Sequence, residues 1–63
     1  MENKVWYYRN ERHMSLRQLS RRTGISITAL NKIENDKTKD VLLGNAIILS
    51  KVLRVDLYEL FCV

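Results

Sequence analysis

The chain has 63 residues, a single cysteine, a single histidine and a net charge of +4 at pH 7. A chain this short buries only about 60% of the surface that it exposes when unfolded, so one domain over residues 1–63 with one core is expected. Cys62 and His13 cannot form an internal disulfide or a Cys/His metal cage, and with the scattered carboxylates they make no catalytic set. The sequence therefore predicts a protein that is not an enzyme and has no metal or cofactor.

Hydropathy argues against a membrane protein. No stretch approaches the roughly 18 apolar residues that cross a bilayer. The first residues, Met-Glu-Asn-Lys, lead into aromatic and charged residues rather than the apolar core of a signal peptide. We therefore expect a soluble, cytoplasmic protein without a membrane partner.

The surplus positive charge is confined to one part of the chain. Residues 1–40 contain nine basic and five acidic residues, whereas residues 41–63 contain two of each. A basic surface that serves only solubility is the simpler alternative, but the asymmetry favours a polyanionic partner for the first part of the chain.

Helices are predicted over nearly the whole chain, which contains no proline: about residues 3–12, 16–23, 27–34, about 42–53, and 57 to about 61. In the first helix, Val5 and Tyr8 are the expected core positions. At least one of the intervening aromatic residues, Trp6 and Tyr7, is therefore expected to face outward.

The second helix, residues 16–23, has clear start and stop signals. Its inward stripe consists of apolar or small residues with helical spacing: Leu16, Leu19, Ser20 and Thr23. Ser15 is the expected N-cap, and Gln18 is its reciprocal partner. Gly24 follows the stripe, where a left-handed C-cap conformation favours glycine.

The third helix, residues 27–34, begins after a turn of only a few residues, with Ser26 as its expected N-cap. So short a connection suits two crossed helices, and the segment of about residues 16–35 is predicted to be a helix-turn-helix whose second helix enters the major groove of DNA. Leu30 and Ile33 form the core stripe of this helix. Its opposite face carries four residues: Ile27, Thr28, Asn31 and Lys32.

The fourth helix is apolar on more than one side. One inward stripe is predicted: Leu43, Ala46, Ile47, Ser50 and Leu53. Ile48 and Val52 lie on another face, which a surface helix would make polar. We expect a second subunit to cover the surplus, although a small fold can also expose a few apolar groups. The expected dimer interface comprises Ile48, Val52, Phe61 and Val63.

The fifth helix follows Asp56, and the residues 56–59 have the form of a capping box with an acidic cap. The polar segment 35–40 is the one expected loop between helices that is rich in charged residues.

Several segments together resemble the Cro/CI-type, or xenobiotic-response-element, family of helix-turn-helix regulators. These are residues 8–12, Met-Ser at 14–15, the glycine turn, Leu-Asn-Lys-Ile-Glu-Asn at 30–35 with the Asp-Lys-Thr-Lys loop after it, and residues 55–61. The resemblance implies an all-α fold: a compact five-helix bundle with a lambda-repressor-like DNA-binding domain. Members of the family are mostly dimeric repressors or activators that bind two related half-sites of double-stranded DNA.

The resemblance also implies roles for individual residues. Ile27, Thr28 and Lys32 occupy base-reading positions, and Asn31 shares their face. Arg9 pairs with Glu34 and fixes the reading helix to the scaffold. Residues that flank the reading helix are the candidates for phosphate contacts: Ser15, Arg17, Ser26, Asn35, Lys37 and Lys39.

Two departures from the family pattern lie in the second helix. Leu16 stands where the family often has a phosphate-contacting glutamine, and Ser20 replaces the usual alanine. Arg21 and Arg22, near the end of the same helix, are interpreted as a solvated face.

The functional prediction is a dimeric repressor that occupies promoter DNA and is regulated through concentration, dimerisation or a protein partner. Two alternatives remain open at this point. One is a protein-interaction module such as an antitoxin, and the other is a controller protein of a restriction-modification system.

Overall fold

The computed structural model describes residues 2–35 and 41–61, and these residues form five helices with no strand among them. The helices are α1 (Val5–Glu11), α2 (Leu16–Thr23), α3 (Ile27–Glu34), α4 (Leu43–Leu53) and α5 (Leu57–Phe61). The predicted all-α, five-helix fold is confirmed. None of the described helices is long and apolar enough to cross a membrane.

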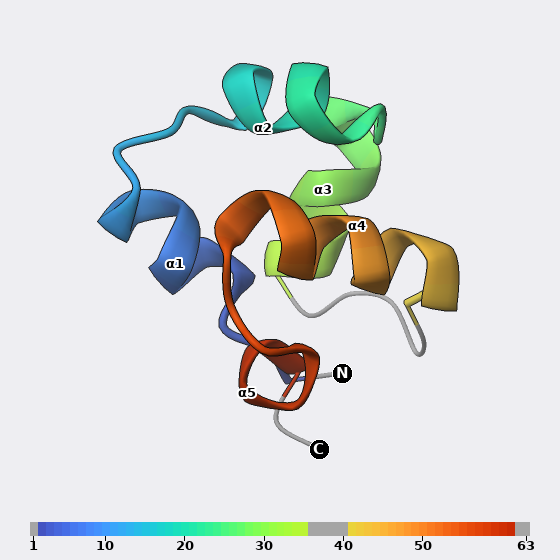
Figure 1. The fold of residues 1–63 in the computed structure, drawn as a ribbon. Coiled ribbons are helices and arrows are strands. Elements are labelled where there is room, and N and C mark those ends of the chain that lie inside the picture. The colour runs from blue at the N-terminus through green and yellow to red at the C-terminus, as the bar shows by residue number, and fades with distance from the viewer. Residues whose placement is uncertain (1, 36–40, 62–63) are drawn as a thin grey trace.

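The fourth helix, α4, organises the bundle. It contacts α1, α2 and α5, and Figure 1 shows it between the α2–α3 pair and α5. Both described ends of the chain lie near α5 in this view. All five helices contribute fully buried side chains to the core: Val5, Leu19, Leu30, Leu49, Leu53 and Leu60. One hydrophobic core therefore fixes the position of the helix-turn-helix.

The first helix starts later than predicted, at Val5 instead of residue 3. Asn3 explains the difference, because its side-chain oxygen accepts a hydrogen bond from the Val5 backbone N–H at 3.0 Å. Trp6 and Tyr7 are 58% and 52% exposed, so both aromatic residues face outward.

Both predicted ends of α2 are confirmed. The Ser15 hydroxyl accepts a hydrogen bond from the Gln18 backbone N–H at 3.1 Å, and the Gln18 side chain accepts one from the Ser15 N–H at 2.7 Å. Gly24 has a φ of 77° and donates its N–H to the Ser20 carbonyl at 2.8 Å. Local hydrogen bonds thus set the length of this helix.

The predicted inward stripe of α4 is wrong in part. Ala46 and Leu53 are buried, but Leu49 is the third buried residue of the helix. Leu43 is 68% exposed and Ile47 is 36% exposed. Because apolar residues occur on several sides of this helix, its periodicity does not single out the buried face. The helix also begins at Leu43, one residue later than predicted.

The capping box predicted before α5 is only half formed. The Asp56 carboxylate accepts a hydrogen bond from the Tyr58 N–H at 3.1 Å, as an N-cap does. The Glu59 side chain does not accept the hydrogen bond from the Asp56 backbone N–H that a complete capping box requires. It accepts hydrogen bonds from Lys4 Nζ at 2.7 Å and from the Tyr8 hydroxyl at 3.1 Å, and so joins α5 to the first helix.

Phe61 corrects another expectation. It is only 5% exposed and packs in the core of the single chain, so it is not surplus apolar surface. Val63 lies outside the described residues.

The Glu59 contacts predict a pH dependence of stability. The Lys4 ammonium and the Tyr8 hydroxyl donate to the Glu59 carboxylate and hold its pKa below the usual 4.5. A carboxyl whose pKa is lowered by folding stabilises the fold above its unfolded pKa, and this contribution is lost as the pH falls through the folded pKa. Glu59→Gln should therefore be less stable than the wild type at pH 7, with the gap closing in acid below pH 4.5.

Urea unfolding of both proteins between pH 2 and pH 7 measures this gap. Because the pair is exposed, solvent and salt screen it and the difference at pH 7 is expected to be small. A gap that stays constant over the whole range would contradict the prediction.

Candidate nucleic-acid interface

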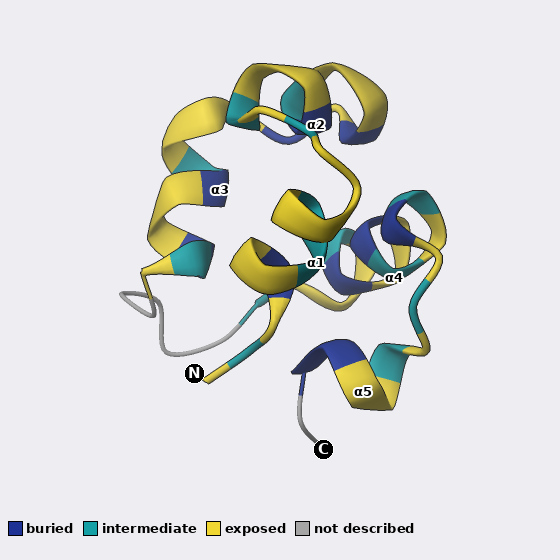
Figure 2. Ribbon diagram, turned by 90° about the vertical axis from the view of Figure 1, so that its left-hand side faces the viewer, coloured by how far each residue is buried: buried dark blue, intermediate teal, exposed yellow. Residues whose placement is uncertain are grey.

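The outer face of α3 is fully presented to solvent. Leu30 and Ile33 are buried beneath it, and Figure 2 shows the opposite side of the helix as exposed. All four residues predicted on this face are exposed: Ile27, Thr28, Asn31 and Lys32. Ile27 is 42% exposed although it is a large apolar residue, so packing in the core does not account for it. The face combines apolar, hydroxyl, amide and ammonium groups, which are the groups that contact base edges.

A groove of about 340 Å³ runs between α3 and the start of α4. Thr28 and Lys32 line it from α3, and Asn45 lines it from the first turn of α4. Leu42, 74% exposed, lies at the same groove. Sequence reasoning missed Asn45 and Leu42, because only the position of α4 in the bundle brings them beside the predicted base-reading residues.

Two predicted contact residues are hydrogen-bonded to each other. Asn35 donates its side-chain N–H groups to the Asn31 carbonyl at 2.9 Å and to the Asn31 side-chain oxygen at 2.8 Å. This arrangement fixes the Asn31 amide and leaves its NH₂ group as the one able to donate to an acceptor on DNA.

An ion pair holds α3 against α1. Arg9 Nε lies 2.6 Å from Glu34 Oε2, and a second guanidinium nitrogen of Arg9 lies 3.0 Å from Glu34 Oε1. The third nitrogen donates to the Met14 carbonyl at 2.9 Å. The side chains are 12% and 4% exposed. The hydrogen bond to Glu34 raises the pKa of Arg9 above its ordinary value, against the opposing effect of burial.

Asn3 provides a second attachment that sequence reasoning missed. Its side-chain N–H donates to the Ile33 carbonyl at 2.9 Å, near the end of α3, while its oxygen accepts from the Val5 N–H at the start of α1. Together with Arg9, this residue connects the last turn of α3 to the first helix. Hydrogen bonds from α1 and the residues before it thus hold α3 in addition to its short connection to α2.

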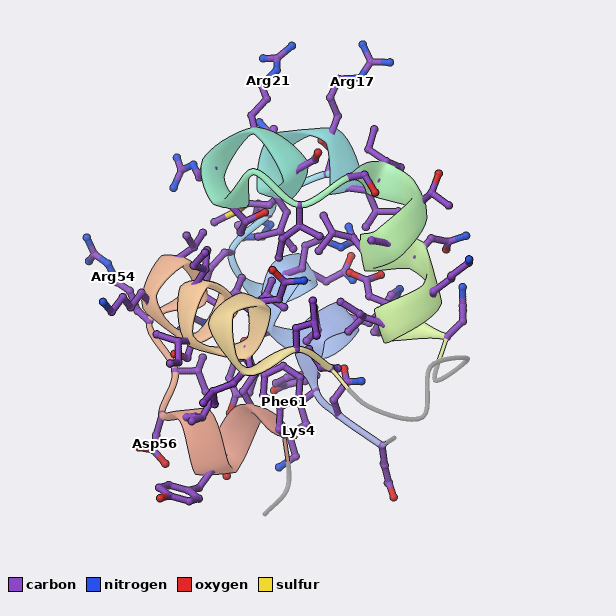
Figure 3. The ribbon with its side chains drawn as sticks, turned by 90° about the vertical axis from the view of Figure 1, so that its right-hand side faces the viewer. Lys4, Arg17, Arg21, Arg54, Asp56 and Phe61 are labelled. Atoms are coloured by element: carbon purple, nitrogen blue, oxygen red, sulfur yellow. The ribbon has the colours of Figure 1, made fainter. Side chains whose placement is uncertain are left out.

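Of the residues predicted to contact phosphate, Ser15, Arg17 and Ser26 lie at the starts of α2 and α3, and Asn35 is the C-cap of α3. Ser15 and Ser26 are exposed N-caps of α2 and α3, and the Ser26 hydroxyl accepts from the Ala29 N–H at 3.1 Å. Arg17 is exposed, and Figure 3 shows it projecting from α2 on the side toward α3. Helix starts carry partial positive charge and free N–H groups, which suit phosphate. Lys37 and Lys39 lie outside the described residues.

The two departures in α2 have structural roles. Leu16 is half-buried and packs against the core. The Ser20 hydroxyl donates to the Ile25 carbonyl at 2.6 Å and so links α2 to the turn. Neither change disturbs the helix-turn-helix.

No group of three or more metal-binding side chains occurs in the part of the chain that the structure describes. The site's chemistry is that of exposed amide, hydroxyl, guanidinium and ammonium groups on a rigid pair of crossed helices, which is suited to binding a polyanion.

Comparison with known proteins agrees with this geometry. The model of the helix-turn-helix family HTH_3, of the Cro/CI type, matches residues 7–60, which is most of the chain. The comparison with curated proteins found no match. The matched region contains all of α2, α3 and α4 and ends within α5. The chain therefore belongs to the Cro/CI-type helix-turn-helix family of DNA-binding regulators.

Proposed function

We propose that the chain is a cytoplasmic transcriptional repressor that binds two related half-sites as a homodimer. In this proposal, α3 enters the major groove and reads bases through Ile27, Thr28, Asn31 and Lys32. The observation that carries it is that all four residues are exposed on one face of a helix whose other face is buried and whose end is fixed by Arg9. The protein would act by occupying DNA, without catalysis.

Phosphate contacts would come from the residues that flank α3. Ser15, Arg17, Ser26 and Asn35 are exposed around this helix, and Lys37 and Lys39 follow it in the sequence. Such contacts set the register of the protein on DNA and give an affinity that falls with salt.

The exposed apolar surface of α4 supports a dimer. Leu43, Ile47 and Ile48 are 68%, 36% and 38% exposed, and Val52 is half-buried. Ile48 and Val52 were expected from the sequence, whereas Leu43 and Ile47 were expected inside. A two-fold interface over this helix would cover all four residues and would place two α3 helices on one DNA molecule.

Selection of bound sites from random double-stranded DNA tests the proposal. We expect one recovered sequence with two related halves and a binding constant that falls steeply with salt concentration. Recovery of no common sequence, with only weak binding to all DNA, would contradict it.

Lys32→Ala is expected to weaken binding to the selected site by about 1 to 3 kcal/mol and to relax the choice of base at one position in each half-site. Lys32 is exposed on the outer face of α3, where its ammonium group can donate to guanine O6 and N7. Binding to random DNA should change less. Competition between selected and random DNA measures both effects.

Arg17→Gln is the matched control, because it also removes one positive charge from the same motif. As a phosphate contact, Arg17 should contribute to all sequences alike, and its loss should reduce the slope of log affinity against log salt by about one. If Lys32→Ala produces the same uniform loss, Lys32 contacts phosphate and does not read bases.

A protein-interaction module such as an antitoxin is the second candidate, and the exposed apolar residues of α4 favour it. This candidate predicts that the isolated chain is monomeric and that DNA binding requires a second protein. The mass of the isolated chain and its DNA binding without added protein distinguish the two functions.

A further inference from the structure

A second basic site lies away from α3. A pocket of about 390 Å³ is formed by the segment that follows α1, one side of α2 and the end of α4. It is lined by Arg12, His13, Met14, Gln18, Arg22, Val52 and Arg54, and we call it the arginine pocket. None of these residues is acidic. Within the described part of the chain, none of the three arginines forms an ion pair.

Arg12 is held in place by its neighbours. Its Nε donates to the Leu53 carbonyl at the end of α4 at 2.9 Å, and its guanidinium lies 5.4 Å from the centre of the Tyr8 ring. The two terminal nitrogens make no hydrogen bond to the described residues. A guanidinium fixed in this way presents a planar pair of donors, which matches the oxygens of a phosphate.

The backbone at the arginine pocket is unusual in two places. Three described residues have a positive φ: Gly24, His13 and Arg54. Gly24 adopts this conformation at little cost, but His13 at 55° and Arg54 at 57° adopt it with side chains that disfavour it. Both of these residues line the pocket, and Gly24 does not. Arg54 is the C-cap of α4 and His13 follows the C-cap of α1, so two helix ends place basic side chains at one pocket, in positions where glycine would be less strained.

The arginine pocket is separate from the proposed DNA surface. In Figure 3, Arg54 projects from the side of the molecule opposite α3. None of the described residues expected to contact bases or phosphates of DNA lines the pocket. The basic groups here are therefore not explained by binding of α3 in the major groove.

We propose that the arginine pocket binds a small phosphorylated molecule. Three guanidinium groups supply charge and hydrogen-bond donors for the phosphate, and Met14 offers an apolar wall for the remainder of the ligand. The volume falls within the range of about 300 to 1,000 Å³ that is common for small-molecule sites. This inference does not depend on which DNA sequence the protein recognises.

Calorimetry with inorganic pyrophosphate at constant ionic strength tests the inference. We expect saturable binding to the wild type and clearly weaker binding of citrate, which carries carboxylates instead of phosphate. Val52 also belongs to the proposed dimer surface. The titration is therefore made at a protein concentration at which the oligomeric state does not change when pyrophosphate is added. Absence of saturable pyrophosphate binding, or equal binding of citrate, would overturn the proposal.

Arg54→Gly removes one guanidinium from the pocket and relieves the strained backbone. Pyrophosphate should bind about tenfold more weakly, as expected for the loss of a charge-assisted hydrogen bond, while the melting temperature stays the same or rises. An unchanged affinity would show that Arg54 does not contact the ligand and would overturn the assignment.

Arg22→Gln and Arg21→Gln form a matched pair. Both remove one positive charge from neighbouring positions of α2, but only Arg22 lines the pocket, and Figure 3 shows Arg21 pointing away from the body of the protein. Pyrophosphate binding should weaken for Arg22→Gln and stay near the wild-type value for Arg21→Gln. Equal losses of affinity in the two variants would mean a general effect of net charge and would contradict the proposal. Displacement of bound pyrophosphate by double-stranded DNA would assign the pocket to DNA and would also contradict it.

Discussion

Replacing Arg9 with alanine is expected to lower the free energy of unfolding by about 3 to 5 kcal/mol, because Glu34 would remain buried without its partner. The Glu34 side chain is only 4% exposed and accepts two hydrogen bonds from Arg9. Domains gain roughly 0.05 to 0.15 kcal/mol of stability per residue, so a chain of this length has about 3 to 9 kcal/mol in total and would lose a large part of it. The variant is expected to be largely unfolded at 37 °C.

Urea unfolding in the presence of a stabilising osmolyte measures the loss for Arg9→Ala, Glu34→Ala and the double variant. The double variant should lose clearly less than the sum of the two single variants, because no charge is left without a partner. Additive losses would show that the two side chains do not act as a pair.

Lys4→Met is a suitable control, because Lys4 also forms a close ion pair, at 2.7 Å from Glu59, but with both side chains 46% exposed. An exposed pair contributes little to stability, so this variant should remain folded. A loss as large as that of Arg9→Ala would mean that burial is not what makes the Arg9–Glu34 pair important.

The pair can also be replaced without unfolding the protein. In Arg9→Met with Glu34→Leu, apolar side chains fill the space, and such exchanges of buried ion pairs are often neutral for stability. The Met14 carbonyl would lose its hydrogen bond from Arg9, at a cost of about 1 kcal/mol. If the ion pair serves to orient α3, this variant should keep its fold and bind selected DNA with reduced preference over random DNA.

Local chemistry explains why parts of the fold could be predicted from the sequence. The limits of α2 follow from Ser15, Gln18 and Gly24, whose hydrogen bonds and backbone conformations depend only on near neighbours. The exposed face of α3 also follows from periodicity, because Leu30 and Ile33 are its clear apolar positions.

Other features depend on contacts between distant segments and could not be predicted in this way. Asn3 reaches the end of α3, and Glu59 reaches Lys4, although these partners are far apart in the sequence. The buried face of α4 was predicted correctly only at Ala46 and Leu53, because this helix is apolar on several sides and only its packing partners select Leu49 for the core. The groove that brings Asn45 beside Lys32 arises from the same packing.

Ile48→Asp is expected to weaken dimerisation at least about a hundredfold. Burial of a fully exposed isoleucine side chain contributes roughly 1.5 to 3 kcal/mol, so covering the exposed part of two copies of Ile48 contributes about 1 to 2 kcal/mol. Two aspartates in the same place would add the larger cost of burying carboxylates without partners. Ile48 is 38% exposed on α4, so its replacement leaves the core of the single chain in place. Phe61→Asp is not a comparable test, because Phe61 is 5% exposed and its loss would unfold the monomer.

Sedimentation should show the wild type as a dimer at tens of micromolar and Ile48→Asp as a monomer, with unchanged circular dichroism. Tyr58→Asp introduces the same charge at an exposed residue of α5, 64% accessible, and should remain dimeric. On DNA, two α3 helices about 34 Å apart would contact successive turns, so Ile48→Asp should lose the affinity gained from the second half-site but still recognise one half. A wild-type chain that sediments as a monomer and binds single half-sites as well as pairs would show that the exposed face of α4 does not serve dimerisation.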